Sequence, residues 1–187
     1  MTRRFEIEHT PLRDFVVLTR KPVGDQRGWF ERLYCADELE SVNLTKPIRQ
    51  INRSFTRRQG TIRGLHFQHP PQAETKLVSC LRGRVFDVAV DLRRGSSTFL
   101  NYHGVELSEH NSKTAFIPKG FAHGFQTLTP DCVLLYLHTA NYTPTSEDGV
   151  HPLDRTLSIA WPEDEKFLSD RDANLPSILE DFEGVQL

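Results

Sequence analysis

Apolar and polar residues alternate in many short segments of the chain, a pattern that is typical of β-strands. These segments are rich in Val, Leu and Phe, and turn residues separate each from the next. They cover residues 14–20, 48–55, 61–67, 76–83, 84–92, 102–108, 114–118, 124–129, 132–140 and 157–162. Short strands spaced in this way predict a sandwich or a barrel.

Helical patterns are confined to two stretches of the sequence. Residues 35–42, "CADELESV", form the first, and residues 169–183 form the second, which Pro176 interrupts. The chain has no internal repeat and no Gly/Ser-rich linker, and its 187 residues are enough for one sizeable core. We therefore expect a single, mostly β domain over residues 1–187, with a few short helices.

Alternation also sorts polar side chains onto one face of particular strands. Asp87 and Asp91 lie on the face opposite Val88, and Tyr136 and His138 share a face further along the chain. The simplest interpretation of each strand alone is a half-wet sheet that exposes these side chains to water. If several such strands converge, the same side chains instead line a polar site.

Charge and cysteine content narrow the classes of partner. The chain carries 23 Lys and Arg against 25 Asp and Glu, so no global positive field attracts a nucleic acid or an anionic membrane. The N-terminal residues lack the apolar run of a signal peptide, and no stretch approaches the roughly 18 apolar residues of a membrane-spanning helix. Cys35, Cys80 and Cys132 lack the CxxC spacing of zinc and redox sites. We expect a cytoplasmic protein without disulfides that binds neither nucleic acid nor membrane.

One local pattern points to a particular kind of barrel. The segment "PKGFAHGF" has the form PxGxxH, with Pro118, Gly120 and His123, which resembles the second sequence motif of cupin jelly rolls. The first cupin motif is incomplete: Gly83 is present, but Lys76 stands where that motif has a metal-binding glutamate. An ammonium group cannot coordinate a divalent cation and repels it, so we expect no metal at this place.

Five segments in a fixed order resemble one family of cupin-like enzymes. The segments "RGLHFQ", "TKLVSCLRGRVFDVAVDLRRGSSTF", "IPKGFAHGF", "LLYLHTANYTP" and "LSDRD" are similar to those of the dTDP-4-dehydrorhamnose 3,5-epimerases, over about residues 10–175. The resemblance implies a cupin-like jelly-roll barrel, a homodimer, no metal and no organic cofactor. It also implies a nucleotide-sugar substrate, foremost dTDP-4-dehydro-6-deoxy-D-glucose, which would become dTDP-4-dehydro-L-rhamnose.

This chemistry inverts a carbon next to a ketone: a weakly acidic proton is removed, the enolate is held, and a proton returns to the opposite face. The resemblance assigns the base to His66, and a neutral imidazole suits that role because its pKa is about 6.5. It assigns Asp172 to orient this imidazole. Both residues also have ordinary interpretations. His66 could be a structural histidine at a strand end, and Asp172 could merely complete a helix cap that Ser169 begins.

The enolate and the returning proton require two further groups. Lys76 is the candidate for the positive partner of the enolate oxygen, and the alternative is a surface lysine with a solvated head group. Tyr136 is the family's proton donor, because a phenol with a pKa of about 10 is protonated at neutral pH. Its alternative is a core tyrosine with a hydrogen-bonded hydroxyl, and His138 and Tyr142 compete for the donor role.

Substrate binding follows from the same resemblance, position by position. The expected substrate-binding residues are Arg27, Gln50, Asn52, Arg63, Lys76, His123, Glu147 and Arg171. The arginines suit diphosphate oxygens because a guanidinium group can donate two parallel hydrogen bonds. One departure concerns Arg32, which stands where the family usually has a glutamate, with Glu31 one place early. That departure leaves the nucleotide base and the hexose open.

Three other activities remain as alternatives. A 3-only or 5-only epimerase or a 3,4-ketoisomerase could act on a CDP-, GDP- or UDP-linked keto sugar with the same kind of barrel. A metal-dependent cupin would need the ligand set that Lys76 disrupts. A non-catalytic sugar-nucleotide binding protein could keep the arginines while losing His66, Tyr136 or Asp172, and the chain has all three.

Overall fold

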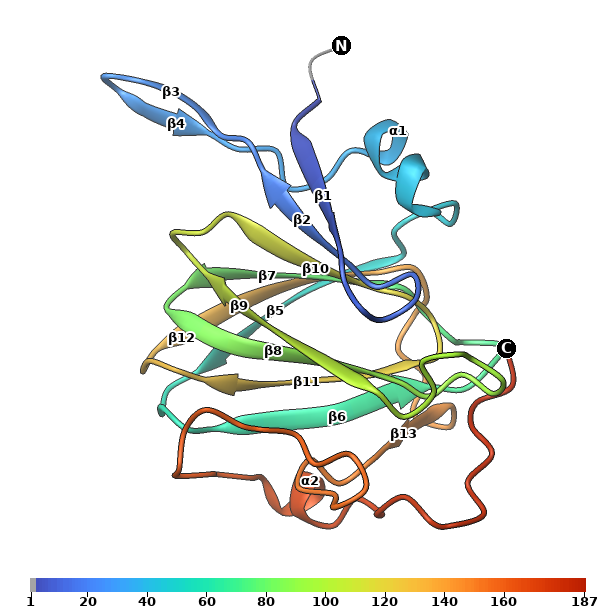
Figure 1. Ribbon diagram of the computed structural model, residues 1–187. Coiled ribbons are helices and arrows are strands. Elements are labelled where there is room, and N and C mark those ends of the chain that lie inside the picture. The colour runs from blue at the N-terminus through green and yellow to red at the C-terminus, as the bar shows by residue number, and fades with distance from the viewer. Residues whose placement is uncertain (1–2) are drawn as a thin grey trace.

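Two antiparallel β-sheets lie face to face in the computed structural model, which describes residues 3–187 (Figure 1). The six-stranded sheet has the order β1-β2-β10-β7-β12-β5, and the five-stranded sheet has the order β13-β6-β11-β8-β9. The six strands are β1 Phe5–His9, β2 Val16–Arg20, β10 Lys113–Ile117, β7 Lys76–Arg82, β12 Cys132–His138 and β5 Gln50–Thr56. The five strands are β13 Glu147–Gly149, β6 Ile62–Gln68, β11 Phe121–Thr127, β8 Arg84–Asp91 and β9 Tyr102–Ser108. Neighbours in space are mostly distant in sequence, as in the predicted jelly roll.

The space between the two sheets holds the main hydrophobic core. Val78 from the six-stranded sheet and Val85 and Ala89 from the five-stranded sheet are fully buried there. Leu134 and Tyr136 pack in the same cluster, so the face of β12 that carries them points between the sheets and not toward solvent. This core fills one end of the barrel interior, and polar side chains gather at the other end.

The outer faces of both sheets are also partly covered. The C-terminal segment places Leu157 and Trp161 against Val88 on the five-stranded sheet. On the six-stranded sheet, the helical segment over residues 36–42 packs Leu39 against Leu18. Strands covered on both faces are expected to be apolar on both, which explains the nearly continuous apolar runs in β7 and β12.

The helices are shorter than the sequence predicts. The first predicted helix is present as α1 Ala36–Leu39 followed by the 3₁₀ turn η1 Glu40–Val42. The second is reduced to α2 Asp170–Ala173. After α2 the chain runs on without regular structure against the five-stranded sheet, so the helix predicted for residues 169–183 is wrong beyond its first turn.

The strand predicted for residues 157–162 is also absent from the described structure. The carboxylate of Asp154 accepts hydrogen bonds from the backbone N–H groups of Thr156 and Leu157, at 2.8 and 3.0 Å, and holds this segment in turns. Its apolar residues nevertheless are buried, because Leu157 and Trp161 cover the outer face of the sheet. The hydrophobic pattern therefore predicted burial correctly and the backbone conformation wrongly.

The half-wet interpretation of β8 is wrong, because Asp87 and Asp91 are both fully buried. Each has a cationic or imidazole partner, as buried carboxylates require. Asp91 pairs with Arg93 at 2.8 Å, and Asp87 pairs with His123 at 2.8 Å. The inner face of this strand therefore carries polar pairs within the barrel.

A separate hairpin, β3 Val23–Asp25 and β4 Gly28–Phe30, projects away from the barrel (Figure 1). Trp29 and Phe30 in this hairpin are each 72% exposed. Large aromatic side chains on a projecting hairpin have no core of their own to enter. Such side chains suit a contact with a second chain.

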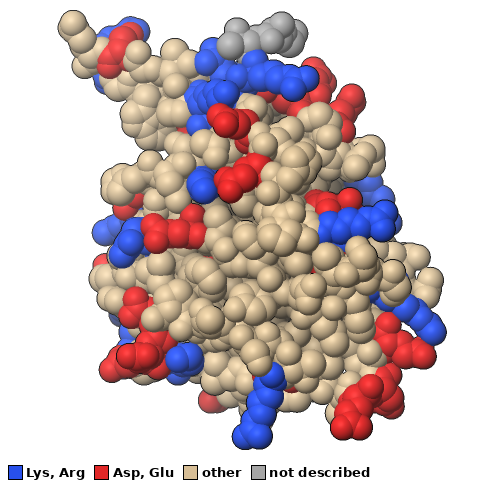
Figure 2. Space-filling view, in the orientation of Figure 1, with Lys and Arg blue, Asp and Glu red and all other residues tan. Residues whose placement is uncertain are grey.

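The surface carries charges of both signs. On the face in Figure 2, lysines and arginines alternate with aspartates and glutamates, and broad uncharged areas separate them. This distribution agrees with the net charge of -2. None of the helices within residues 3–187 combines the length and the apolar character needed to cross a membrane.

The cysteines are free thiols in different environments. Cys80 and Cys132 are buried in the main core, whereas Cys35 is half-buried beside α1. Burial raises the pKa of the Cys80 thiol to about 12. The Cys80 thiol is therefore not ionised at neutral pH in the folded protein.

Candidate active site

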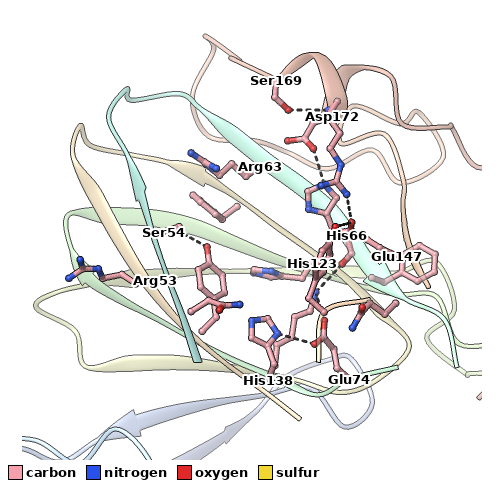
Figure 3. Close-up of a pocket in the computed structure, with 18 residues that line it drawn as sticks. Arg53, Ser54, Arg63, His66, Glu74, His123, His138, Glu147, Ser169 and Asp172 are labelled. Atoms are coloured by element: carbon pink, nitrogen blue, oxygen red, sulfur yellow. Dashed lines mark hydrogen bonds and ion pairs between the residues drawn. The ribbon is translucent and has the colours of Figure 1, made fainter. Parts of the chain in front are cut away.

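A cavity of about 400 Å³ opens at the polar end of the barrel, between the two sheets and α2 (Figure 3). His66 lies on its wall in β6, and the His66 Nε2 atom is 2.8 Å from Oδ1 of Asp172 in α2. The His66 side chain is 27% exposed, whereas that of Asp172 is 5% exposed. The imidazole therefore reaches the cavity while its carboxylate partner is shielded from water.

The carboxylate of Asp172 is held as an anion. Burial by itself raises the pKa of Asp172, but hydrogen bonds from His66 and from the Gly64 N–H outweigh it and lower the pKa. The helix cap is present as well, because the backbone N–H of Asp172 donates to the Ser169 hydroxyl at 3.1 Å. Cap and dyad thus use different atoms of the same residue: the backbone of Asp172 completes the cap, and its side chain holds His66.

Lys76 lies at the start of β7 and is 8% exposed, so it is no surface lysine. Its Nζ atom donates to the backbone carbonyl of His66 at 3.2 Å and lies 3.4 Å from a carboxylate oxygen of Glu74. The other carboxylate oxygen of Glu74 is 3.0 Å from Nδ1 of His138. An ammonium group is thereby fixed on the cavity wall directly beside the carbonyl of the candidate base.

Tyr136 enters the same cavity from β12, in the sheet opposite His66. Its hydroxyl is 3.1 Å from the Ser54 hydroxyl, and its ring stacks on His138 with the ring centroids 6.0 Å apart. Burial raises the pKa of the Tyr136 phenol well above its ordinary value. The phenol therefore holds its proton throughout the neutral range, as a donor must.

His123, in β11, forms a second imidazole–carboxylate pair. Its Nε2 atom is 2.8 Å from Oδ2 of Asp87, and both side chains are buried. The register between β11 and β6 places His123 directly opposite His66. The cavity wall thus carries two imidazoles side by side, each anchored by its own carboxylate.

The mouth of the cavity carries the polar residues expected to hold an anionic substrate. Arg63 donates to the Thr56 hydroxyl at 3.0 Å and extends along the opening. Arg171 and Glu147 form an ion pair, and the Tyr142 hydroxyl donates to the same Glu147 carboxylate at 2.8 Å.

A smaller cavity of about 240 Å³ adjoins the first and shares part of its wall. Gln50 and Asn52 line it, and the Gln50 amide donates to the Asn52 side-chain oxygen at 3.1 Å. The Tyr142 backbone N–H donates to the Gln50 side-chain oxygen at 3.0 Å. Together the two cavities give an elongated site that suits a ligand with two parts.

Arg27 is the one expected substrate-binding residue that the described chain leaves far from the cavity. It lies in the turn of the β3–β4 hairpin, its side chain is 90% exposed, and it pairs with Asp25 at 2.6 Å. The departure at Arg32 likewise lies outside the cavity. Arg32 pairs with Glu38 at 2.8 Å, and Glu31 is buried in an ion pair with Arg20 at 3.0 Å.

The cavity lining also includes polar residues that the sequence does not predict to act at the site, among them Arg53, Ser54 and Glu74. Glu74 precedes its strand by two residues, so strand alternation gives no reliable direction for its side chain. The pairing of His138 with Lys76 across β12 and β7 is the feature that brings Glu74 into place. Within residues 3–187, no three His, Cys, Asp or Glu side chains converge as a metal site would require.

The fold defines a cupin-like barrel, and its cavity brings imidazole–carboxylate pairs together with a buried lysine and a partly buried tyrosine. The family model described as dTDP-4-dehydrorhamnose 3,5-epimerase matches residues 9–180. The chain is 42% identical over 159 residues to the dTDP-4-dehydrorhamnose 3,5-epimerase of Streptomyces griseus, covering 84% of this chain and 78% of that one. It therefore belongs to the dTDP-4-dehydrorhamnose 3,5-epimerase family, and it is an enzyme of the isomerase class.

Two further relatives bear on the activity. A dTDP-6-deoxy-D-glucose-3,5-epimerase from Legionella pneumophila Philadelphia 1, solved in complex with dTDP-4-keto-L-rhamnose, has a TM-score of 0.88 at 40% identity and covers 92% of each chain. A dTDP-4-dehydrorhamnose 3-epimerase from Streptomyces niveus is 38% identical over 156 residues, which are 83% of this chain and 75% of that one. Overall identity therefore does not separate double from single epimerases.

Proposed function

We propose that the protein inverts C3 and C5 of dTDP-4-dehydro-6-deoxy-D-glucose and so forms dTDP-4-dehydro-L-rhamnose. The observation that carries this proposal is the convergence of His66, Lys76 and Tyr136 on one cavity from two opposed sheets. These are the three kinds of group that the chemistry requires: a base, a fixed cation and a proton donor. The match to relatives with this activity supports the choice of substrate.

In the proposed mechanism, His66 removes the proton next to the ketone. Asp172 holds the imidazole in the tautomer that leaves the cavity-facing nitrogen free, and it stabilises the imidazolium that forms. Lys76 donates to the oxygen that becomes negative in the enolate. Tyr136 then delivers a proton from the opposite side of the sugar, which inverts the carbon.

Substrate binding is proposed to use the two adjoining cavities. Arg63 and Arg171 hold diphosphate oxygens, because guanidinium groups suit bidentate contacts with phosphate. The side-chain amides of Gln50 and Asn52 in the smaller cavity can donate hydrogen bonds to the nucleobase of the substrate and accept hydrogen bonds from it. His123 and Glu147 line the larger cavity and contact the sugar.

A homodimer accounts for the position of Arg27. The projecting hairpin carries Trp29 and Phe30, and the edge strand β5 exposes Ile51 and Phe55. Burial of these side chains against a second copy would stabilise a dimer by removing apolar surface from water. In such a dimer the hairpin of one protomer brings Arg27 to the partner's cavity. The free cysteines further support a reducing, cytoplasmic location.

The decisive experiment is turnover in deuterated water. With dTDP-4-dehydro-6-deoxy-D-glucose, NMR should show deuterium at both C3 and C5 of the product, and CDP-, GDP- and UDP-linked analogues should react more slowly. The His66→Asn variant should lose exchange at both carbons, because one base serves both. Deuterium at C3 alone in the wild-type product would instead assign the 3-epimerase activity of the Streptomyces niveus relative. Exchange that persists in His66→Asn would remove His66 from the role of base.

A further inference from the structure

Glu74 occupies a position that the proposed mechanism leaves unexplained. Its side chain is 7% exposed, and it lies on the wall of the cavity although it takes no part in the steps above (Figure 3). A carboxylate near a developing enolate would repel it, so an unpartnered anion here would oppose catalysis. The two contacts of Glu74, with Lys76 and with His138, therefore decide what it does.

The hydrogen bonds of the Lys76 ammonium group leave one donor for a substrate. An ammonium group has three N–H donors. One points to the carbonyl of His66 at 3.2 Å, and a second faces Glu74 at 3.4 Å. Within residues 3–187 the third has no partner in the protein, and Lys76 borders the cavity. Glu74 and the His66 carbonyl thus fix two directions and leave the third toward the reacting sugar.

Burial makes the charge of this lysine dependent on its surroundings. The Lys76 side chain is 10% exposed, and only its protonated form can stabilise an enolate. A neighbouring anion favours the protonated form of an amine. The carboxyl group of Glu74 is such an anion: burial raises its pKa, but the hydrogen bond from His138 and the charge of Lys76 outweigh burial and lower it.

We propose that Glu74 is a positioning residue that keeps Lys76 protonated and aims its free N–H into the cavity. This inference rests on the proposed function, because it explains how Lys76 can serve an enolate from a buried position. His138 completes the arrangement, since its Nδ1 atom holds the second carboxylate oxygen and fixes the orientation of Glu74. The register supports it, as His138 and Lys76 are direct partners across β12 and β7.

The other anions of the cavity wall are already engaged. Asp172 pairs with His66, Glu147 pairs with Arg171, and Asp87 behind the wall pairs with His123. The remaining charged or titratable side chains on the wall are Arg53, Arg63, Tyr136 and Tyr142. None of these is an anion at neutral pH, so Glu74 is the carboxylate whose removal changes the field at Lys76 most.

The first test follows Lys76 itself and needs no substrate. The protein is labelled with ¹³C at the lysine Cε atoms, the Lys76 signal is assigned by its loss in Lys76→Met, and the signal is titrated with pH. Glu74→Gln should lower the titration midpoint of Lys76, because it removes an opposite charge at short range. Glu74→Asp keeps the charge and should restore part of the shift. Glu38→Gln, the same change in the ion pair with Arg32 outside the cavity, should leave Lys76 unchanged.

The second test measures catalysis. Because activity requires the ammonium form, the alkaline limb of kcat should move to lower pH in Glu74→Gln by the same amount as the NMR midpoint, with KM nearly unchanged. As a control, the C3 exchange rate is measured against pH with and without Glu74→Gln in a Tyr136→Phe background. Because that background lacks the phenol, a limb that persists there cannot come from Tyr136. An unchanged Lys76 midpoint in a folded Glu74→Gln variant would overturn the proposal, and so would a shifted midpoint with an unshifted limb. Absence of deuterium exchange in the wild-type protein would instead refute the proposed function, while the NMR titration would still judge the Glu74–Lys76 coupling.

Discussion

At the scale of single residues, Asp172 joins two tasks that are usually separate. Its backbone N–H caps α2 through Ser169, and its carboxylate holds His66. Two interpretations that compete in the sequence therefore apply together, since they concern different atoms. Single substitutions can separate them.

We expect Asp172→Ala to reduce turnover strongly and Ser169→Ala to leave it nearly intact. The first change removes the partner that orients His66, whereas the second removes only the acceptor of one backbone N–H. Loss of a cap hydroxyl costs about 1 kcal/mol of folding free energy, so Ser169→Ala should unfold at a somewhat lower temperature. Measured kcat beside thermal unfolding decides the matter: equal losses of activity in the two variants would mean that the helix end, and not the dyad, matters for catalysis.

Tyr136→Phe should separate the two epimerisations. The ring and its stacking on His138 remain, and only the hydroxyl next to Ser54 is lost. Deprotonation by His66 continues, so exchange at C3 should persist with some inversion by water, while inversion at C5 should fail. Product NMR in deuterated water reads both positions, and C5 inversion at the wild-type rate would assign the donor role to another group such as Tyr142.

At the scale of elements, the close approach of the paired strands β6 and β11 sets the spacing between His66 and His123. Gly64 has a φ angle of +117°, and a Cβ atom there would lie 2.6 Å from the Gly124 Cα atom and from the His123 carbonyl oxygen. Only a residue without a side chain permits the two strands to approach so closely. The Gly64 N–H also donates to Asp172, so the same stretch of β6 supports the pair of His66 and Asp172 directly.

Gly64→Ala should therefore destabilise the fold by about 3 kcal/mol or more, because it combines a disfavoured φ with a backbone overlap. Gly28→Ala is the matched control, since Gly28 has a φ angle of +135° with nothing within 4 Å of its Cβ position. The control isolates the conformational cost of about 1 to 2 kcal/mol. The free energies of unfolding of both variants are compared by chemical denaturation. Similar losses would mean that the two strands can move apart to accommodate the added methyl group.

The sequence predicts the strands best in segments that belong to one of the two packed sheets, because the two faces of such a segment have different neighbours. Residues 76–83 and 132–140 are predicted as strands and form β7 and β12, but the alternation alone does not say that the face with Leu134 and Tyr136 points inward. The errors lie in segments that contact only one face. Leu157 and Trp161 cover a sheet without joining it, so their apolar character carries no information about their backbone.

At the scale of the whole molecule, the site could be predicted only in part. His66, Lys76 and Tyr136 were expected from the family resemblance, and the structure brings all three to one cavity. Glu74 could not be foreseen, because its position depends on the pairing of β12 with β7, which no local pattern encodes. Arg27 shows the opposite limit: the family resemblance predicts that it binds substrate, but within a single chain it lies outside the cavity.

The dimer proposal gives a prediction at this scale. Changing both Trp29 and Phe30 to Ser should shift the protein toward monomer in sedimentation and reduce activity, because Arg27 would no longer reach a partner's cavity. Changing Leu179 to Ser, which removes another apolar side chain that is 69% exposed, should change neither property. A monomeric wild-type protein, or a dimer unaffected by the double change, would contradict the proposed assembly.

The two core thiols have a practical consequence. Alkylating reagents attack the thiolate, and Cys80 and Cys132 lie between the sheets, with the pKa of Cys80 raised to about 12. In an opened chain the Cys80 thiol would return to an ordinary pKa of about 8.5, and both thiols would become accessible to the reagent. The rate at which Cys80 and Cys132 are alkylated therefore measures how often the two sheets separate. Alkylation of Cys35 measures only its accessibility at the surface. Mass spectrometry of the alkylated protein can therefore report the opening of the barrel without any engineered cysteine.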